Sequence, residues 1–410
     1  MKKSNKTCLL FTQSFPYGNS ELFLKDELKF LSDYFNKILI FPLNSFNQKN
    51  IKLAENVFVI DLFNEVKTKN NSIKDYLNLL KIVLSEFKCD PINMIKHLRF
   101  NLSLLNSELQ KAKIFESYLK SNYNSNQFVF YSYWFDTWSI ILSIIKLKSP
   151  HLITSYYSRA HGFDIYKDQT KNGYHPFKNF MLKQVSKVFT ISKNGQNYLR
   201  KNYKLYQNKI QHSYLGSTFN KFTDKINKPQ LVILTCAKVR SIKRIELIPD
   251  ILKELPNTFN VKWILIGDGE GIYEIKDKCI HLNNNIECVF TGNLSKEKVI
   301  EFYHNNRIDL FLSVSRSEGL PYTMIEAISF GIPLLSTDVG GCSEICNDNT
   351  GILIEKDFDV KDVANKIVSF AKSEKNTNLF RAGVRRYWEE NFNAEKNYIN
   401  FYEEIVNDEK

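Results

Sequence analysis

Short apolar runs alternate with amphipathic segments through the second half of the chain, and this alternation restricts the possible folds more than any other feature. Six runs have the length and composition of buried strands: LVILTCA (231–237), VKWILIG (261–267), ECVFTG (287–292), LFLSVS (310–315), IPLLST (332–337) and TGILIE (350–355). The stretches 244–255, 296–306 and 323–331 between them have helical periodicity. Strands that alternate with helices are typical of β-α-β units. We therefore predict a doubly wound α/β domain here.

The first half of the chain shows the same alternation less regularly. Strands are expected at 8–14, 37–43, 128–135 and 187–192, and a helix at 22–35, after the turn residues of FPYGNSE (15–21). Residues 75–120 read as helical, amphipathic and basic, with a break at Pro91. A polar stretch at 216–230 precedes the strand at 231. Because 410 residues exceed what one core usually supports, we predict domains at 1–218 and 219–385, followed by a segment at 386–410.

Charge is distributed unevenly between the two halves. Residues 1–200 contain 28 Lys and Arg against 15 Asp and Glu, whereas residues 201–410 contain 28 against 29. A basic half suggests contact with a polyanion or an anionic membrane, although the whole chain is rich in lysine. A nucleic-acid-binding module would share this charge, but its recognition motifs are missing and the basic residues are spread along the first 200 positions.

The cysteines and the N-terminus bear on the cellular compartment. Seven cysteines without even spacing argue against a disulfide-stapled secreted protein, and Cys342 and Cys346 have no nearby His or Cys with which to form a zinc site. The apolar stretch after the N-terminal lysines is shorter than a signal-peptide core and far below the ~20 residues that span a bilayer. We therefore expect a cytoplasmic protein without an integral membrane segment.

The segment 313–345, SVSRSEGLPYTMIEAISFGIPLLSTDVGGCSEI, carries the densest chemistry. Glu318 and Glu326 flank a strand-to-helix turn that contains Gly319 and Pro321. A helix that begins near Tyr322 would direct its free N–H groups at the sheet edge, an arrangement that binds phosphate. Carboxylates on either side would accept hydrogen bonds from sugar or ribose hydroxyls. Taken alone, such a pair of glutamates is usually surface charge.

In its context this segment resembles the retaining glycosyltransferases of family 4. The positions in register with the family pattern are Ser315, Glu318, Gly319, Pro321, Glu326, Ala327, Gly331, Pro333, Gly340, Gly341 and Glu344. CAKVRSIKRIELI (236–248) resembles the family loop whose cations hold the donor diphosphate. Lys243 matches the family lysine, Lys238 stands where arginine is usual, and Arg240 could supply the guanidinium instead.

Other segments extend the resemblance. IGDGEG (266–271) is similar to a turn that closes one wall of the family's cleft, and FTGNLS (290–295) to the loop near the nucleotide base, which points to Gly292, Asn293 and Leu294. SRAHGFDIY (158–166) resembles the H-G-x-D segment, which implies that His161 lies near the donor sugar and the acceptor. Arg159 and Asp164 would be either participants or supports of that loop.

Two further segments fit the same family. FPYGNSELF (15–23) resembles the loop over the reaction centre, with Gly18 allowing close backbone approach and Glu21 as a further member. WEENFNAEKNYINF (388–401) resembles a C-terminal helix that crosses back to the N-terminal domain.

The resemblance implies an α/β protein of the GT-B fold, with two Rossmann-like doubly wound domains facing across a cleft. Residues 1–218 would bind the acceptor, 219–385 the nucleotide sugar, and 386–410 would cross back. The implied catalytic residues are Glu318, His161 and Lys243. The implied donor-binding residues are Gly18, Lys238, Arg240, Lys243, Gly292, Asn293, Leu294, Glu318, Gly319, Leu320, Pro321, Tyr322, Thr323 and Glu326.

The activity implied is transfer of a hexose, with retention, from a nucleoside-diphosphate sugar to a hydroxyl of a growing, lipid-linked glycan. The resemblance is to bacterial enzymes of O-antigen, capsule, lipopolysaccharide and exopolysaccharide assembly. It implies no metal and a peripheral position at the inner face of the cytoplasmic membrane, reached through the basic N-terminal half. No nucleic-acid partner is expected. A nucleotide-sugar epimerase on the same fold is the alternative, whereas a dehydrogenase is disfavoured because G-x-G-x-x-G follows neither first strand.

Overall fold

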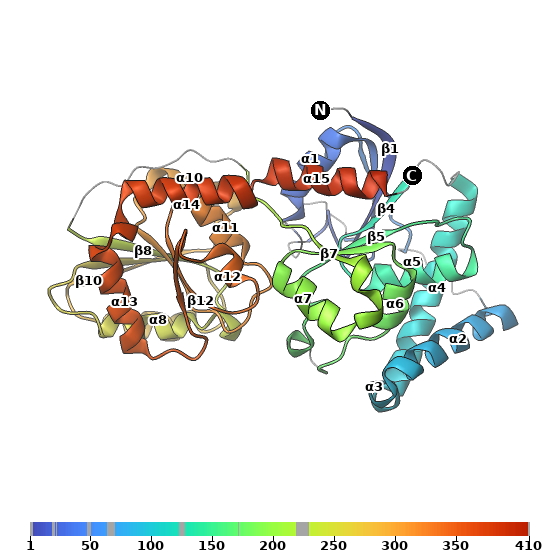
Figure 1. The fold of residues 1–410 in the computed structure, drawn as a ribbon, viewed down its shortest axis with the longest axis horizontal. Helices are drawn as coiled ribbons and strands as arrows, with labels where there is room; N and C mark the ends of the chain where they lie inside the picture. The colour runs from blue at the N-terminus through green and yellow to red at the C-terminus, as the bar shows by residue number, and fades with distance from the viewer. Residues whose placement is uncertain are drawn as a thin grey trace. The chain divides into compact units, whose positions relative to one another are not determined.

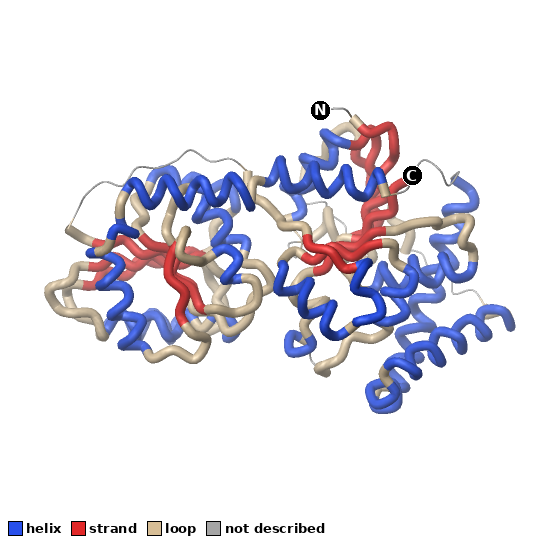
Figure 2. Tube along the Cα trace, viewed as in Figure 1, coloured by secondary structure: helices blue, strands red, loops and turns tan. Residues whose placement is uncertain are grey.

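The chain folds into two compact units, each built around its own sheet (Figures 1 and 2). A computed structural model describes residues 3–18, 21, 23–46, 51–63, 70–122, 128–170, 172–218 and 229–408. The first unit comprises Met1–Ser213 and Tyr398–Lys410, and the second comprises Tyr214–Asn397. None of the described helices is both long and apolar enough to cross a bilayer.

The first unit contains a seven-stranded parallel sheet in the order β3-β2-β1-β4-β5-β6-β7. Its strands are β1 (Ser4–Thr12), β2 (Phe35–Pro42), β3 (Val57–Val59), β4 (Phe128–Ser132), β5 (Tyr157–Ala160), β6 (Lys187–Thr190) and β7 (Ile210–His212). Leu10 pairs with Ile40 on one side and with Tyr131 on the other. The central strands are continuously apolar because both faces of a parallel sheet are covered.

Helices and short 3₁₀ turns connect these strands. The helices are α1 (Leu24–Tyr34), α2 (Ile73–Cys89), α3 (Pro91–Lys96), α4 (Leu98–Asn122), α5 (Thr137–Lys148), α6 (Lys178–Gln184) and α7 (Lys193–Asn202), with 3₁₀ turns η2 (Lys167–Gln169) and η3 (Lys204–Lys209). The predicted break at Pro91 is confirmed, and a second break follows at His97.

The second unit contains a six-stranded parallel sheet in the order β10-β9-β8-β11-β12-β13. Its strands are β8 (Leu231–Cys236), β9 (Val261–Ile266), β10 (Ile286–Gly292), β11 (Leu310–Ser313), β12 (Leu334–Thr337) and β13 (Gly351–Ile354). The helices are α8 (Ile248–Lys253), α9 (Ile272–Ile280), α10 (Lys296–Asn305), α11 (Tyr322–Ser329), α12 (Cys342–Ile345), α13 (Val360–Lys372) and α14 (Asn378–Asn391), with 3₁₀ turns η4 (Ser241–Lys243), η5 (Ile245–Leu247) and η6 (Glu374–Asn376). All six predicted strands are present, each within two residues of its expected start.

The expected single helix at 388–401 is wrong, because the segment is interrupted. The helix α14 ends at Asn391, and α15 (Ala394–Asn407) begins three residues later. Ser217 accounts for the break: its N–H donates to the Phe392 carbonyl at 3.1 Å, and its carbonyl accepts from Ala394 N at 3.1 Å. From Tyr398 onward α15 belongs to the first unit, where the Tyr402 hydroxyl donates to the Glu27 carbonyl.

Both sheets have a topological switch point, where the strand order reverses. It lies between β1 and β4 in the first unit and between β8 and β11 in the second. In parallel α/β sheets, ligands bind outside the carboxyl ends of the strands at this position. The loops after β1, β4, β8 and β11 are therefore where a site is expected.

Candidate functional site

The loops after β8 and β11 meet through an ion pair at the switch point of the second unit. Lys243 Nζ lies 2.5 Å from Glu318 Oε1, and Arg316 N donates to the Ile242 carbonyl at 2.8 Å. Both charged side chains are partly exposed, and they line a small hollow together with Ser315 and other residues. The structure thus brings together two of the three residues that the sequence predicted to be catalytic.

Arg244, which is not among the site residues predicted from the sequence, holds these two loops in place. Its Nε donates to the Val314 carbonyl at 2.8 Å, and its second terminal nitrogen donates to the Ser315 carbonyl at 3.3 Å. The residue is buried and adopts a left-handed conformation with φ +50°. A cation directly after Lys243 was visible in the sequence, but its backbone conformation and its partners were not.

The turn that carries Glu318 is packed against the loop after β12. A Cβ at Gly340 would lie 1.8 Å from the Glu318 carbonyl oxygen, so only glycine permits this approach. Gly341 N donates to the Gly319 carbonyl at 2.9 Å, and the Thr337 hydroxyl donates to the Ser315 carbonyl at 2.7 Å. The paired glycines of the motif therefore fix the turn.

The helix α11 begins directly after this turn. Pro321 occupies its N-cap position and has no side-chain acceptor for the first-turn N–H groups. The side chains of Leu320 and Pro321 are buried, whereas those of Tyr322 and Thr323 are partly exposed. Backbone N–H groups and the helix dipole at such an end favour an anion. The predicted phosphate-binding turn therefore consists of Gly319, Leu320, Pro321, Tyr322 and Thr323.

Glu326 lies one turn into α11 and is 5% exposed. Its Oε1 is 3.6 Å from Lys296 Nζ, which also donates to the Tyr322 hydroxyl at 3.2 Å and lies over the Tyr322 ring. Burial raises the pKa of the Glu326 carboxyl, and Lys296 offsets part of this rise. Lys296 was not singled out from the sequence, since no local pattern links it to Glu326.

Lys296 also connects Glu326 to the predicted base-binding loop. It is the first residue of α10, which directly follows Gly292, Asn293, Leu294 and Ser295. Gly292 has φ +70°, and its carbonyl accepts from Gly267 N at 2.9 Å, so the loops after β9 and β10 are joined. Asn293 is exposed, and Leu294 is partly exposed.

The predicted cations Lys238 and Arg240 are arranged differently from Lys243. Both are exposed. Arg240 lines a hollow of about 590 Å³ with Glu246, Glu270 and Glu274 among its walls, and that hollow contains neither Lys243 nor Glu318. Arg240 therefore lines a different hollow from the Lys243–Glu318 pair, one whose walls include three glutamates.

His161 lies at the end of β5 in the first unit, buried among aromatic rings. Its ring centroid is 4.2 Å from that of Trp134 and 4.8 Å from that of Tyr133. Neither ring nitrogen forms a hydrogen bond within the described part of the chain. Asp164 accepts from the backbone N–H groups of His161 at 2.5 Å and Phe135 at 2.9 Å. Asp164 is therefore a support that joins the loops after β4 and β5.

Glu21 holds the loop that carries Gly18, as Asp164 holds the loop after β5. Its buried carboxylate accepts from Ser14 N at 2.6 Å, Phe15 N at 2.7 Å and Trp134 Nε1 at 2.5 Å. It thereby connects the loop after β1 to the loop after β4. Gly18 follows in this loop with φ +63°, a conformation that favours glycine.

Arg159 lies in β5, is fully buried and contacts side chains from other elements of the first unit. Its Nε donates to the Tyr131 hydroxyl at 2.9 Å and lies 3.6 Å from Glu27, and its guanidinium carbon is 4.1 Å from the Phe401 ring centroid. The switch-point region of the first unit thus contains Gly18 and His161, held by Glu21 and Asp164.

Comparison with known proteins finds glycosyltransferases. Residues 217–387, most of the second unit, match the family model described as "Glycosyl transferases group 1". The chain is 33% identical over 130 residues to the O-antigen biosynthesis glycosyltransferase WbnH of Escherichia coli, a segment that is 32% of this chain and 35% of that protein. It is 26% identical over 179 residues to the amylovoran biosynthesis glycosyltransferase AmsD of Erwinia amylovora, covering 42% and 49% of the two chains. The matches thus span about a third to a half of these relatives.

Solved structures extend the likeness to both units. The apo form of the lipopolysaccharide outer core galactosyltransferase WaaB aligns over 98% of this chain and 100% of its own, with TM-score 0.67 and 14% identity. Anabaena HepE in complex with UDP-glucose aligns over 98% and 99%, with TM-score 0.61 and 14% identity. The prediction of a GT-B fold with two Rossmann-like domains is confirmed. The predicted resemblance to glycosyltransferases of bacterial polysaccharide assembly is confirmed as well.

Proposed function

We propose that this chain, whose second unit matches the group 1 glycosyl transferases, moves a hexose from a nucleoside-diphosphate sugar to a hydroxyl of a growing bacterial surface glycan. The observation that carries the proposal is the meeting of Lys243, Glu318 and the N-terminus of α11 at the β8–β11 switch point. The UDP-glucose complex of HepE supports the donor class, and the names of WbnH and AmsD support the acceptor class.

In this proposal the donor diphosphate replaces Glu318 as the partner of Lys243. The ammonium and the first-turn N–H groups of α11 stabilise the negative charge that grows on the diphosphate as its bond to the sugar breaks. Glu318, released from Lys243, accepts hydrogen bonds from the sugar. Glu326 accepts hydrogen bonds from hydroxyls of the ribose or the sugar. The ring of His161 binds the donor sugar or the acceptor.

The proposed course is substitution with retention. The bond between the anomeric carbon and the diphosphate breaks, a bond to the acceptor oxygen forms on the same face, and the acceptor proton passes to the departing diphosphate. No metal is part of this proposal, so transfer should persist in excess EDTA. The acceptor is a lipid-linked oligosaccharide at the inner face of the cytoplasmic membrane, as the basic N-terminal half suggests.

Donor and reaction are tested in two steps. A thermal-shift screen of nucleoside-diphosphate sugars identifies the donor, since a ligand that binds only the folded state raises the unfolding temperature. The chosen donor is then incubated with and without a lipid-pyrophosphate oligosaccharide, and the product's anomeric configuration is determined by NMR. Acceptor-dependent release of the nucleoside diphosphate and a retained configuration are expected. Conversion of the donor sugar without acceptor would instead identify a nucleotide-sugar epimerase.

A further inference from the structure

The helix α2 exposes an apolar stripe along its length. The stripe consists of Ile73, Tyr76, Leu77, Leu80, Leu84 and Phe87, all of them exposed. Residues spaced by three and four positions lie on one side of a helix. Ile73 is 81% exposed, and Leu77, Leu80 and Leu84 are each more than half exposed. A contiguous apolar surface of this kind marks an interaction site.

The opposite side of α2 packs against the unit through both polar and apolar residues, with Leu79 and Val83 partly buried against the core. Its buried residues are Asp75, Asn78, Ile82 and Glu86. An ordinary surface helix buries its apolar side and exposes its polar side. The helix therefore buries three polar side chains while it leaves the six apolar residues of the stripe exposed, and specific contacts hold it in this orientation.

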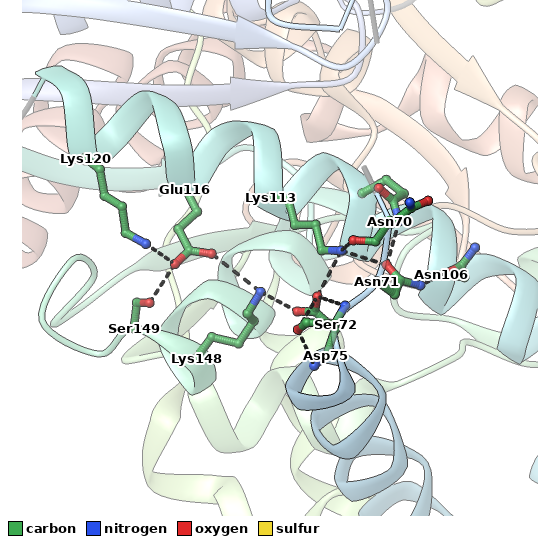
Figure 3. Close-up of polar contacts among 11 residues, drawn as sticks. Asn70, Asn71, Ser72, Asp75, Asn106, Lys113, Glu116, Lys120, Lys148 and Ser149 are labelled. Carbon is green, nitrogen blue, oxygen red and sulfur yellow. Dashed lines mark hydrogen bonds and ion pairs between the residues drawn. The ribbon is translucent and has the colours of Figure 1, made fainter. Parts of the chain in front are cut away.

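Ion pairs hold the N-terminal end of α2 in this orientation (Figure 3). Asp75 forms ion pairs with Lys148 at 2.8 Å and Lys113 at 2.9 Å, which ties α2 to α5 and α4. Lys148 also lies 3.6 Å from Glu116, whose carboxylate accepts from Ser149 Oγ at 2.7 Å. A capping box between Ser72 and Asp75 completes the anchor.

A second carboxylate holds the C-terminal half of the helix. Glu86 accepts from Phe180 N at 2.9 Å and from the backbone and side-chain nitrogens of Asn179, each at 3.2 Å. These bonds join α2 to the first turn of α6. Because both halves of α2 are fixed by buried carboxylates, rotation that would bury the stripe is opposed.

Lysines border the stripe along one edge. Lys74, Lys81 and Lys88 are exposed and recur every seven residues, which places them in a row along one side of the helix, two turns apart. The chain continues into α3 and the start of α4 with further exposed apolar residues: Ile92, Ile95, Leu98, Phe100 and Leu102. Between positions 73 and 107 every exposed charged residue is basic, since Asp75, Glu86 and Asp90 are buried or half-buried.

We infer that the stripe of α2 and its lysine edge form the surface by which the protein docks on an anionic phospholipid bilayer. The apolar side chains would enter the boundary between headgroups and acyl chains, and the lysines would contact lipid phosphates. A second copy of this chain is a poorer partner, because two basic faces repel each other. The inference rests on the proposed membrane location, but it concerns a surface separate from the donor site.

The test is flotation of the full-length protein with vesicles of 30% phosphatidylglycerol in phosphatidylcholine, and with phosphatidylcholine alone. The combined variant Leu77→Gln, Leu80→Gln, Leu84→Gln should lower partitioning onto the anionic vesicles at least tenfold. The matched control Leu205→Gln with Ile280→Gln changes residues that are 83% and 76% exposed and should bind like the unaltered protein. Circular dichroism and the unfolding midpoint verify that each variant folds.

Lysine variants distinguish binding through the lysine edge of α2 from binding through the overall positive charge of the protein. Lys74→Gln, Lys81→Gln and Lys88→Gln together should weaken binding and reduce its salt dependence. The same three changes at Lys29, Lys201 and Lys204, which are also exposed, should have a much smaller effect.

Three results would overturn the inference. The first is a stripe variant that floats like the unaltered protein, and the second is equal recovery on the two vesicle types. The third is self-association in sedimentation velocity that the stripe variant abolishes while vesicle binding persists, which would assign the stripe to a second copy. Transfer to a water-soluble acceptor should not change in the stripe variant, so failure of this surface is distinguishable from failure of the proposed activity.

Discussion

The Lys243 ammonium and the Glu318 carboxylate lie 2.5 Å apart, although 75 positions separate them in the chain. The pair joins the two loops at the switch point of the second unit, where a phosphate would compete with Glu318 for the same cation. Loss of either charge should therefore affect turnover, and the two variants should differ in how they do so.

For Lys243→Ala, we expect kcat/KM to fall at least tenfold, about 1.4 kcal/mol, because the donor diphosphate would lose the cation proposed to hold it. Glu318→Ala should reduce kcat more than donor affinity. Steady-state kinetics with donor titration measures both effects. A Glu318→Ala turnover within about threefold of the unaltered protein, less than 0.7 kcal/mol of barrier, would remove this residue from the reaction centre.

Arg240→Ala and Lys238→Arg serve as matched variants for that experiment. Arg240 lines a separate hollow, so we expect its loss to leave kcat/KM within about threefold, and arginine at 238 should be tolerated. A large loss in Arg240→Ala with normal kinetics in Lys243→Ala would move the phosphate site to the other hollow.

Donor binding should depend on pH through Glu326. Burial raises the pKa of this carboxyl, so its charged form is depleted at a higher pH than for an ordinary glutamate. Donor affinity should therefore decline as pH falls through the raised value. Calorimetric titrations from pH 8 to pH 5 should show this decline, and Glu326→Gln should bind weakly at every pH. Lys296→Met should shift the decline to higher pH, since Lys296 lowers the pKa of Glu326.

The Arg244 side chain should affect activity because it positions the loops after β8 and β11, and not because it contacts the substrate. Arg244→Gly removes the bonds to the Val314 and Ser315 carbonyls but suits the left-handed backbone, whereas Arg244→Ala retains a strain of about 1 kcal/mol. We expect both variants to lose kcat, with the alanine variant less stable in urea. Added guanidinium at millimolar concentration should restore part of the activity of Arg244→Gly. Absence of any kcat effect would contradict this role.

His161→Ala should lower kcat at least tenfold while donor affinity stays within about twofold, because the residues proposed to hold the donor phosphates belong to the second unit. Asp164→Asn tests the support of the loop separately, since it weakens the bonds to the His161 and Phe135 N–H groups and should lower the unfolding midpoint. Donor affinity that falls in parallel with kcat in His161→Ala would place this histidine on the donor alone.

The contribution of the Asp75 ion pairs, which anchor α2, to the free energy of unfolding should depend on pH. Burial raises the pKa of Asp75, but hydrogen bonds from Lys148, Ser72 and Lys113 together hold it well below its usual range. Its stabilising effect is therefore present above the unfolded-state pKa of about 3.9 and is lost as pH falls towards the native value. At pH 7, Asp75→Asn should be less stable by about 1–3 kcal/mol, because Lys113 and Lys148 lose the carboxylate that they share.

This difference in the free energy of unfolding should shrink between pH 4 and pH 2, as measured by urea denaturation. The exposed Asp33→Asn serves as the control and should be nearly neutral throughout. A constant difference over this range would show that the charge of Asp75 does not hold the helix.

Local patterns in the sequence determined much of the fold and part of the site. The alternation of strand and helix periodicity is sufficient to predict the parallel sheet of the second unit. Pro91 predicts the helix break because proline cannot continue a helix. Lys243 and Glu318 were singled out from motif register, and the structure brings them together. The break at residues 392–393 was missed, since it depends on hydrogen bonds to Ser217, far away in the chain.

Only the tertiary structure decided which groups meet and which side of a helix is buried. Neither the left-handed Arg244 nor the pairing of Lys296 with Glu326 follows from a local pattern, because their partners come from other loops. The sequence of α2 predicts an amphipathic helix, and periodicity alone would bury the side that carries Leu77, Leu80 and Leu84, which is exposed instead. The partners of Asp75 and Glu86 on α4, α5 and α6 turn that side outward, because a carboxylate is buried only where such partners satisfy it.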